Sequence, residues 1–183
     1  MRVVAGKYRG KTLKSCADKR IRPTSGRIKE TLFNILYSKG FCEGIAVLDL
    51  FSGSGALGIE ALSRGAAKCV FADIDRESVA LTKQNLKVAG AESAAEVYHA
   101  DYKTAVQKLS GRKFDLILID PPFKSRKESE IIALILKEGI LAPNGVIVIE
   151  HGRENELKDL PEGISCETRV CGNTKLTFLT NNG

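Results

Sequence analysis

Residues 47–58, with the sequence VLDLFSGSGALG, contain the pattern that decides the fold. An apolar run that includes one carboxylate, Asp49, leads into the glycine-rich turn Gly53-Ser54-Gly55 and then into a helical pattern. This order is typical of nucleotide-binding α/β folds, because the turn lets a ligand approach the backbone and the following helix points its N-terminus at that ligand. The segment therefore predicts a nucleotide-type pocket with an acid beside it.

Apolar runs and helical patterns alternate along the rest of the chain. The runs at 116–119 and 146–149 are continuously apolar, which is typical of strands buried on both faces of a parallel sheet. We expect strands at 46–50, 69–72, 96–100, 116–119 and 146–150, and helices at 56–64, 76–89, 103–109 and 128–138.

The end of the chain follows a different pattern. Residues 165–170 and 175–179 are separated only by Cys171-Gly172-Asn173-Thr174, which leaves no room for a crossover helix, so this pair is expected to be antiparallel. Together these patterns predict an α/β, doubly wound, Rossmann-like sheet of the class I methyltransferase type, with seven mostly parallel strands and an antiparallel C-terminal hairpin.

A basic extension precedes this sheet. Residues 2–4 and 12–13 flank a glycine-containing turn and predict a β-hairpin, and a helix is expected at 25–37. We expect two parts: a hairpin and helix extension at 1–40, and a catalytic domain at 41–183.

Positive charge is concentrated in this extension. Residues 1–30 contain ten Lys or Arg and two acids, whereas the whole chain carries only +6, so the remainder is slightly acidic. A basic arm attracts a polyphosphate partner, because each phosphate contact releases counterions. The alternative is a solubilising face, but Tyr8 and several glycines are interleaved with Lys7, Arg9 and Lys11, which favours nucleic acid.

The composition sets further bounds. At 183 residues and 43% hydrophobic, the chain has material for one sizeable core. It contains neither a run of about twenty apolar residues nor an N-terminal apolar signal segment, so we expect a cytoplasmic protein with no membrane role. The five cysteines are scattered and form no CxxC pair, so we expect reduced thiols and no metal site.

The turn GSGALG at 53–58 also matches the GxGxxG pattern of dinucleotide dehydrogenases, in which the helix N-terminus binds a pyrophosphate. Asp49 argues against that interpretation, since a carboxylate beside the turn repels a pyrophosphate and suits a ligand with an ammonium and a sulfonium. Asp73 fits both, because either ligand presents a ribose diol to it. An Asp that merely caps the turn remains the structural alternative for Asp49.

A second motif, Asp120-Pro121-Pro122-Phe123, follows another apolar strand. This motif could prepare an exocyclic base amine to accept a methyl group. Such an amine is a poor nucleophile, because its lone pair is delocalised into the ring. The Asp120 carboxylate and the Pro121 carbonyl could accept hydrogen bonds from both of its N–H groups, while Phe123 stacks on an extruded base. An Asp-Pro turn is the alternative.

Asp101-Tyr102 follows the third expected strand. Asp101 could accept from the adenine amine of a cofactor while Tyr102 lies along the base, or Asp101 could be an ordinary helix cap. His99 and His151 are interpreted as structural, since the expected mechanism needs no imidazole base.

Several of these motifs together resemble the RsmD family of bacterial small-subunit ribosomal RNA guanine-N2 methyltransferases. The similarity covers nearly the whole chain, and its segments are VAGKYRG at 4–10, RPT at 22–24 with Arg27 and ETLFN at 30–34, DLFSGSG at 49–55, DPPF at 120–123 and EH at 150–151. The RPT…R..ETLFN segment is specific, whereas the glycine turn marks only the superfamily.

The resemblance implies S-adenosylmethionine as cofactor and small-subunit ribosomal RNA, in an assembling particle, as partner. Asp73 stands where the family commonly has Glu, one methylene longer. Arg22 or Arg27 would contact a cofactor carboxylate or a phosphate. The predicted cofactor site comprises Asp49, Phe51, Ser52, Gly53, Ser54, Gly55, Gly58, Asp73, Ile74, Asp101 and Tyr102; the predicted catalytic residues are Asp120, Pro121, Pro122 and Phe123; the predicted RNA contacts are Lys7, Tyr8, Arg9, Lys11, Arg22 and Arg27.

The expected reaction is therefore S-adenosylmethionine-dependent methylation of a guanine N2 in 16S ribosomal RNA, forming N2-methylguanosine. Two alternatives stay open at this point. One is an adenine N6 methyltransferase of DNA or RNA, whose target amine would make the same two hydrogen bonds. The other is a nonenzymatic RNA-binding assembly factor.

Overall fold

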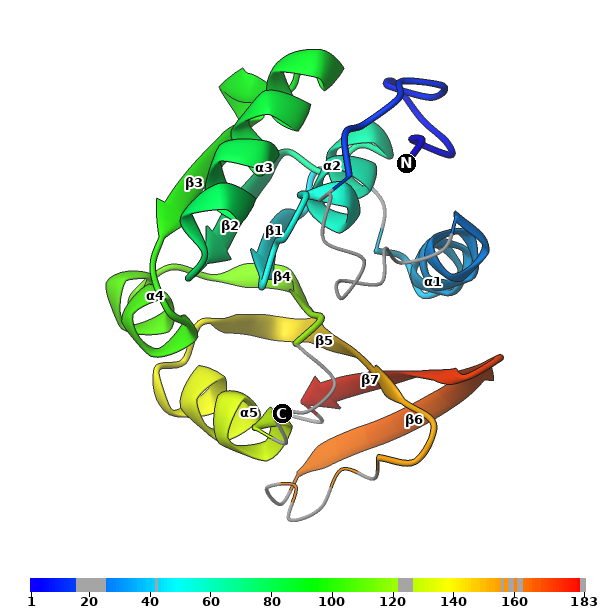
Figure 1. Ribbon diagram of the computed structural model, residues 1–183. Coiled ribbons are helices and arrows are strands. Elements are labelled where there is room, and N and C mark those ends of the chain that lie inside the picture. The colour runs from blue at the N-terminus through cyan, green and yellow to red at the C-terminus, as the bar shows by residue number, and fades with distance from the viewer. Residues whose placement is uncertain are drawn as a thin grey trace.

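The computed structural model describes residues 1–15, 26–41, 43–121, 127–155, 157, 160 and 163–181. A seven-stranded sheet with the order β3-β2-β1-β4-β5-β7-β6 runs through the centre of the molecule (Figure 1). The strands are β1 (Ala46–Leu50), β2 (Lys68–Asp73), β3 (Ala95–His99), β4 (Phe114–Ile119), β5 (Leu141–Gly152), β6 (Ile164–Cys171) and β7 (Thr174–Asn181). The helices are α1 (Gly26–Ser38), α2 (Ala56–Ser63), α3 (Arg76–Ala89), α4 (Tyr102–Lys108) and α5 (Glu128–Lys137), with a 3₁₀ turn η1 (Glu92–Ala94).

The sheet has the predicted mixture of directions. β1, β2, β3, β4 and β5 pair in parallel, and β5–β7 and β7–β6 pair antiparallel, which confirms the expected C-terminal hairpin. β1 lies between β2 and β4, so the strand order reverses there. In open α/β sheets, ligands bind outside the carboxyl ends of the strands at this reversal. The glycine turn after β1 and the motif after β4 both lie at that edge.

Helices cover both faces of the sheet (Figure 1). On one face α1, α2 and α3 pack against side chains such as Val47, Leu116 and Phe178, and on the other α4 and α5 pack against Leu48 and Ile147. Successive residues of β1 therefore enter opposite cores, which is why the strand is apolar at every position except Asp49. Among the helices of the described residues, none has the length and apolar character needed to cross a bilayer.

The N-terminal hairpin is present only as a single antiparallel bridge, Arg2–Thr12, with a few backbone bonds around it such as Val3 N–H to Lys11 O. The backbone amides of residues 4, 5, 7 and 8 instead donate to groups on α2, so they cannot form a ladder across the turn. Val3, Tyr8 and Leu13 belong to the core cluster on that face of the sheet. The extension is therefore anchored along the first helix of the sheet domain.

Candidate active site at the carboxyl edge of the sheet

The glycine turn after β1 has the geometry that its sequence predicts. Gly53 and Gly55 adopt positive φ angles of 53° and 75°, which side chains rarely tolerate. At Gly58, a Cβ atom would lie 2.3 Å from the Phe71 ring and 2.7 Å from Cys69 Sγ, so only glycine lets α2 pack this closely on β2. The two constraints fix the N-terminus of α2 directly beyond the end of β1.

Asp49 lies inside this arrangement, with 2% of its surface exposed. One carboxylate oxygen accepts a hydrogen bond from the Gly58 N–H at 2.9 Å. Burial, opposed by the Gly58 bond and assisted by the nearby charge of Asp73, raises the pKa of Asp49 to about 7. A buried acid with a raised pKa gains stability when a cation is placed beside it, because the opposite charge replaces the lost hydration.

Asp73 closes the other side of the turn. Its carboxylate accepts from the Gly53 N–H at 2.8 Å and from the Asp75 N–H at 2.9 Å, while burial raises its pKa. The amides of Gly53 and Gly58 are thus already bonded to carboxylates. A pyrophosphate would need such amides and would meet two acids in their place, which argues against the dinucleotide interpretation.

A cavity of about 370 Å³ opens beside the turn, between the ends of β1, β2 and β3. Its walls include five predicted cofactor residues: Phe51, Asp73, Ile74, Asp101 and Tyr102. The Phe51 and Tyr102 rings lie 5.9 Å apart, and Ile74 is 67% exposed. Phe51 has a φ of 102°, a strained value for a residue with a side chain, and such strain is concentrated at functional sites. The cavity suits a flat, partly apolar ligand.

Asp101 acts as the cap of α4. Its carboxylate accepts from the backbone amides of Lys103 and Thr104, at 2.9 and 3.0 Å, and from the Thr104 hydroxyl at 2.8 Å. These bonds, the Thr104 amide first, lower the pKa of Asp101. The helix-cap interpretation therefore describes its contacts, and the same cap fixes the residue on the cavity wall.

The second motif lies next to this cavity. β4 pairs with β1 in the register Asp49–Leu118, so Asp120 lies just beyond the end of β4 at the edge that carries the glycine turn. Asp120 is half-buried and Pro121 is buried. Pro122 and Phe123 lie outside the described residues, so their predicted roles stay predictions.

The predicted RNA contacts divide into two groups. Tyr8 is 9% exposed and its amide donates to Ser63 Oγ, so its ring belongs to the core and is not accessible for stacking on a base. Lys7, Arg9 and Lys11 are exposed around it. Arg27 is exposed on α1, and Arg22 lies outside the described residues.

Two buried polar residues of α3 hold the turn and were not predicted. Thr82 Oγ1 donates to Gly53 O at 3.0 Å, and Asn85 Nδ2 donates to Ser54 O at 2.8 Å. Thr82 also lies 3.4 Å from the hydroxyl of Ser52. A signal existed in the sequence, because Ser78, Thr82 and Asn85 place polar groups on the inner face of an otherwise amphipathic helix.

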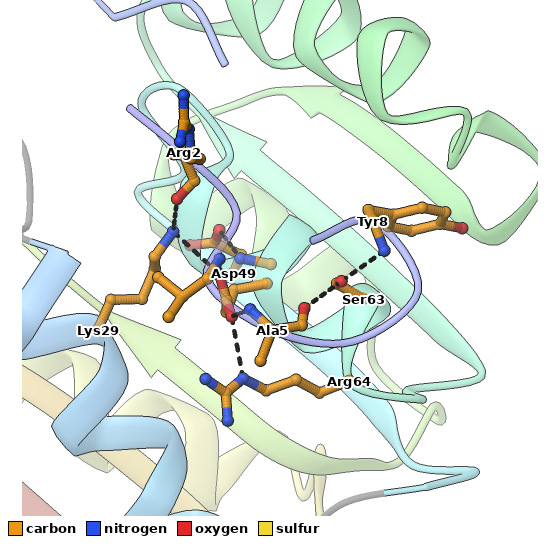
Figure 2. Close-up of polar contacts among 10 residues, drawn as sticks. Arg2, Ala5, Tyr8, Lys29, Asp49, Ser63 and Arg64 are labelled. Carbon is orange, nitrogen blue, oxygen red and sulfur yellow. Dashed lines mark hydrogen bonds and ion pairs between the residues drawn. The ribbon is translucent and has the colours of Figure 1, made fainter. Parts of the chain in front are cut away.

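A third unpredicted residue, Glu60, has no exposed surface and anchors the N-terminal extension to α2. It accepts from the amides of Val4 and Ala5 at 2.9 and 3.0 Å. It also pairs with Lys29 Nζ and Arg64 Nε, each at 3.0 Å, and Lys29 Nζ donates further to Arg2 O (Figure 2). Apart from Arg64, one helical turn further on, its partners lie far away in the sequence, so no local pattern identifies its anchoring role.

Comparison with known proteins assigns the chain to a family. The model of the family described as conserved hypothetical protein 95 matches residues 1–180. The chain belongs to this family.

Within the described residues, no group of three or more His, Cys, Asp or Glu side chains could hold a metal ion.

Several proteins similar to this chain are named as methyltransferases. YlbH of Bacillus subtilis, provisionally named an rRNA methyltransferase, is 40% identical over 161 residues, covering 87% of this chain and 86% of its own. Ribosomal RNA small subunit methyltransferase D of Haemophilus influenzae is 34% identical, covering 86% and 81%. Among solved structures, yhhF of Escherichia coli, provisionally named a methyltransferase, superposes with a TM-score of 0.87 at 32% identity, covering 99% and 97%.

Proposed function

We propose that this family member transfers a methyl group from S-adenosylmethionine to the exocyclic N2 of a guanine in small-subunit ribosomal RNA, forming N2-methylguanosine. One observation carries the proposal. A buried acid lies near the end of β1, the amides of the following glycine turn are bonded to carboxylates, and Asp120 follows the neighbouring β4 at the same edge of the sheet. The small-subunit rRNA methyltransferase names of the relatives favour ribosomal RNA as the substrate.

The residues around the turn fit S-adenosylmethionine. Asp49 is a buried acid with a raised pKa, suited to a ligand that carries positive charge. The cavity that Phe51 and Tyr102 line suits an adenine ring. Asp73, on its wall, would accept hydrogen bonds from a ribose diol. When bound, this cofactor supplies an electrophilic methyl group on a sulfonium.

Asp120 and Pro121 perform the second half of the chemistry. The carboxylate of Asp120 and the carbonyl of Pro121 accept hydrogen bonds from the two N–H groups of the guanine amine. This orients the nitrogen lone pair toward the methyl group and stabilises the positive charge that develops as the bond forms. The amine then releases a proton, and no nucleophilic side chain is required.

The test of this role is Asp120→Ala. Turnover should fall about a hundredfold or more, the scale of losing one key polar contact to a transition state, while cofactor affinity measured by calorimetry stays near that of the wild type. Glu154→Ala, which removes an exposed acid after the end of β5, is the matched control and should leave both values unchanged. Unchanged turnover in Asp120→Ala would refute the role.

Product analysis separates the guanine from the adenine reaction. Small subunits lacking the modification, free ribosomal RNA and duplex DNA are incubated with labelled cofactor and digested to nucleosides. We expect N2-methylguanosine, formed best on the small subunits, since the proposed substrate in the cell is an assembling particle in the cytoplasm. Methyladenine as the main product would overturn the choice of base, and failure to bind the cofactor would favour the assembly-factor alternative.

The basic arm has its own test. Replacing Arg9 and Lys11 by Glu should weaken RNA binding most strongly at low salt, because the exposed side chains act through screened phosphate contacts. Cofactor affinity should not change. Equal binding at all salt concentrations would reduce the arm to a solubilising face.

A further inference from the structure

A second hollow, of about 560 Å³, lies between α1 and the turn that joins β6 to β7. Arg27, Ile28 and Thr31 form one side, and Cys171, Gly172 and Asn173 form the other. None of these residues lines the cofactor cavity. We call this feature the α1–turn groove.

The groove lies at the same edge of the sheet as Asp120. Ile119 of β4 pairs with Ile149, and β5 continues to Gly152, which pairs with Thr174 at the start of β7. With strands about 4.8 Å apart and a rise of about 3.3 Å per residue, Asp120 and the turn are separated by roughly 12 Å along the sheet. A polymer whose target nucleotide is held at Asp120 would therefore reach the groove with its neighbouring nucleotides.

Two exposed arginines lie at the mouth of the groove. Arg27 and Arg153 are exposed, and the Arg153 N–H donates to Asn173 O at 3.1 Å, which places this arginine beside the turn. The acid on the α1 side of β6, Glu167, is already paired with two cations, Lys39 at 2.6 Å and Arg169 at 2.5 Å. Arg27 and Arg153 are therefore the cations that the rim offers to a ligand.

The chemistry of the lining fits a nucleic-acid strand better than a small metabolite. Arginines bind phosphates bidentately, and the exposed Asn173 offers an amide to a ribose or a base edge. Burial and the charge of Glu150 raise the pKa of the half-buried Cys171 thiol, so this lining residue stays neutral and offers a phosphate no charge. Phosphates are therefore expected at the rim.

We propose that the α1–turn groove binds the ribosomal RNA strand adjacent to the target guanosine, with phosphates at Arg27 and Arg153 and a sugar or base edge at Asn173. This inference rests on the proposed function and adds a second RNA contact to the basic arm. The arm is anchored to α2, whereas the groove is formed by α1 and the turn between β6 and β7.

Charge substitutions at one exposed position give the sharpest test. Asn173→Glu should weaken the binding of unmodified small subunits about tenfold, whereas Asn173→Lys should tighten it several-fold, because a phosphate strand responds to the sign of the charge. Ser110, exposed in a turn at the opposite edge of the sheet, supplies the matched controls Ser110→Glu and Ser110→Lys. Both controls should bind like the wild type. Cofactor affinity should be unchanged in all four variants.

A second variant and a cross-link test whether ribosomal RNA occupies the groove. Arg27→Glu should lower the salt dependence of binding by about one phosphate contact, and Lys87→Glu on the last turn of α3 should not. A photoreactive residue at position 173 should cross-link to ribosomal RNA next to the methylated nucleotide.

The outcomes separate the two proposals. Equal affinities for Asn173→Glu and Asn173→Lys, or a cross-link to a ribosomal protein, would overturn the groove inference and leave the proposed function intact. A wild-type protein that binds no cofactor and methylates no ribosomal RNA would overturn both.

Discussion

Asp49 and Glu60 are two buried carboxylates in the same strand–turn–helix unit, and they have opposite surroundings. Within the described residues, Asp49 accepts one hydrogen bond, from Gly58, whereas Glu60 accepts from two amides and two cationic side chains. Burial raises the pKa of Asp49 to about 7. For Glu60, burial has the same tendency, but the bonds from Val4, Lys29 and Arg64 outweigh it and lower the pKa.

The difference separates a binding site from a structural anchor. A buried acid with too few donors remains destabilised until a ligand supplies the missing charge, which is the condition expected at a functional site. A buried acid with a full set of partners contributes stability and has no capacity left for a ligand. We therefore propose Asp49 as part of the cofactor site, whereas Glu60 fixes the N-terminal extension and α1 on α2.

The largest effect on stability is expected for Glu60→Ala. The change leaves Lys29, 2% exposed, as an unpaired buried cation and leaves two amides without acceptors, so the free energy of unfolding should fall by about 3–5 kcal/mol. Urea unfolding measures it. Glu96→Ala, which breaks the more exposed pair with Arg112, is the control and should cost no more than about 1 kcal/mol. Similar losses in the two variants would contradict the anchor role.

Asp49→Asn should weaken cofactor binding without lowering the free energy of unfolding, the reverse of what is expected for Glu60→Ala. Losing the charge should weaken S-adenosylmethionine binding by roughly thirtyfold or more, since truncating one partner of a buried charge pair costs about 2–5 kcal/mol. The cofactor-free protein should be no less stable at pH 8, because the variant removes a poorly solvated charge. Calorimetry and urea unfolding give the two values, with Glu92→Gln, which neutralises an exposed acid outside the site, as the control. A large loss of stability would place Asp49 in the same class as Glu60.

The two acids also predict opposite pH dependence. The folded-state pKa of Asp49 is raised, so between about pH 4 and 7 the folded protein keeps a proton that the unfolded chain releases, and its contribution to stability falls as pH rises through this window. The lowered pKa of Glu60 gives the opposite sign: its contribution is present at neutral pH and is lost as pH falls below its ordinary value.

The measurement compares wild type with Asp49→Asn from pH 5 to 8. The stability of the variant relative to wild type should rise with pH by about 2.5 kcal/mol, and wild-type cofactor affinity should rise about fivefold from pH 6 to 7 as Asp49 loses its proton. A difference that does not change with pH would show that Asp49 is already ionised at pH 5.

Local patterns predicted much of this molecule. The bounds of β1 and α3 agree with the expected 46–50 and 76–89, because a short apolar run before a glycine turn and an Asp-capped amphipathic helix leave few alternatives. β5 was the exception: it begins at Leu141, although Pro143-Asn144-Gly145 is a typical turn sequence. The structure accommodates these residues with a register irregularity opposite β4 and a φ of 61° at Asn144.

Long-range contacts could not be predicted in the same way. The acid beside the glycine turn is visible in the sequence because Asp49 interrupts an apolar strand. Glu60 is not, because its partners in the N-terminal segment and in α1 become neighbours only after folding. The same contacts explain why the expected hairpin is reduced to one bridge.

The smallest effect is expected for Arg64→Ala, which removes a single donor from Glu60. The Arg64 side chain is 17% exposed, its Nε lies 3.0 Å from Glu60, and its guanidinium lies 5.1 Å from the centre of the Phe33 ring. Glu60 keeps Val4, Ala5 and Lys29, so the free energy of unfolding should fall by only about 1 kcal/mol, with Arg64→Lys intermediate because it retains a cation. Cofactor affinity should stay at the wild-type value in both variants. If Arg64→Ala weakened cofactor binding as strongly as Asp49→Asn, the two carboxylates would form one coupled site, and the separation between anchor and binding site would fail.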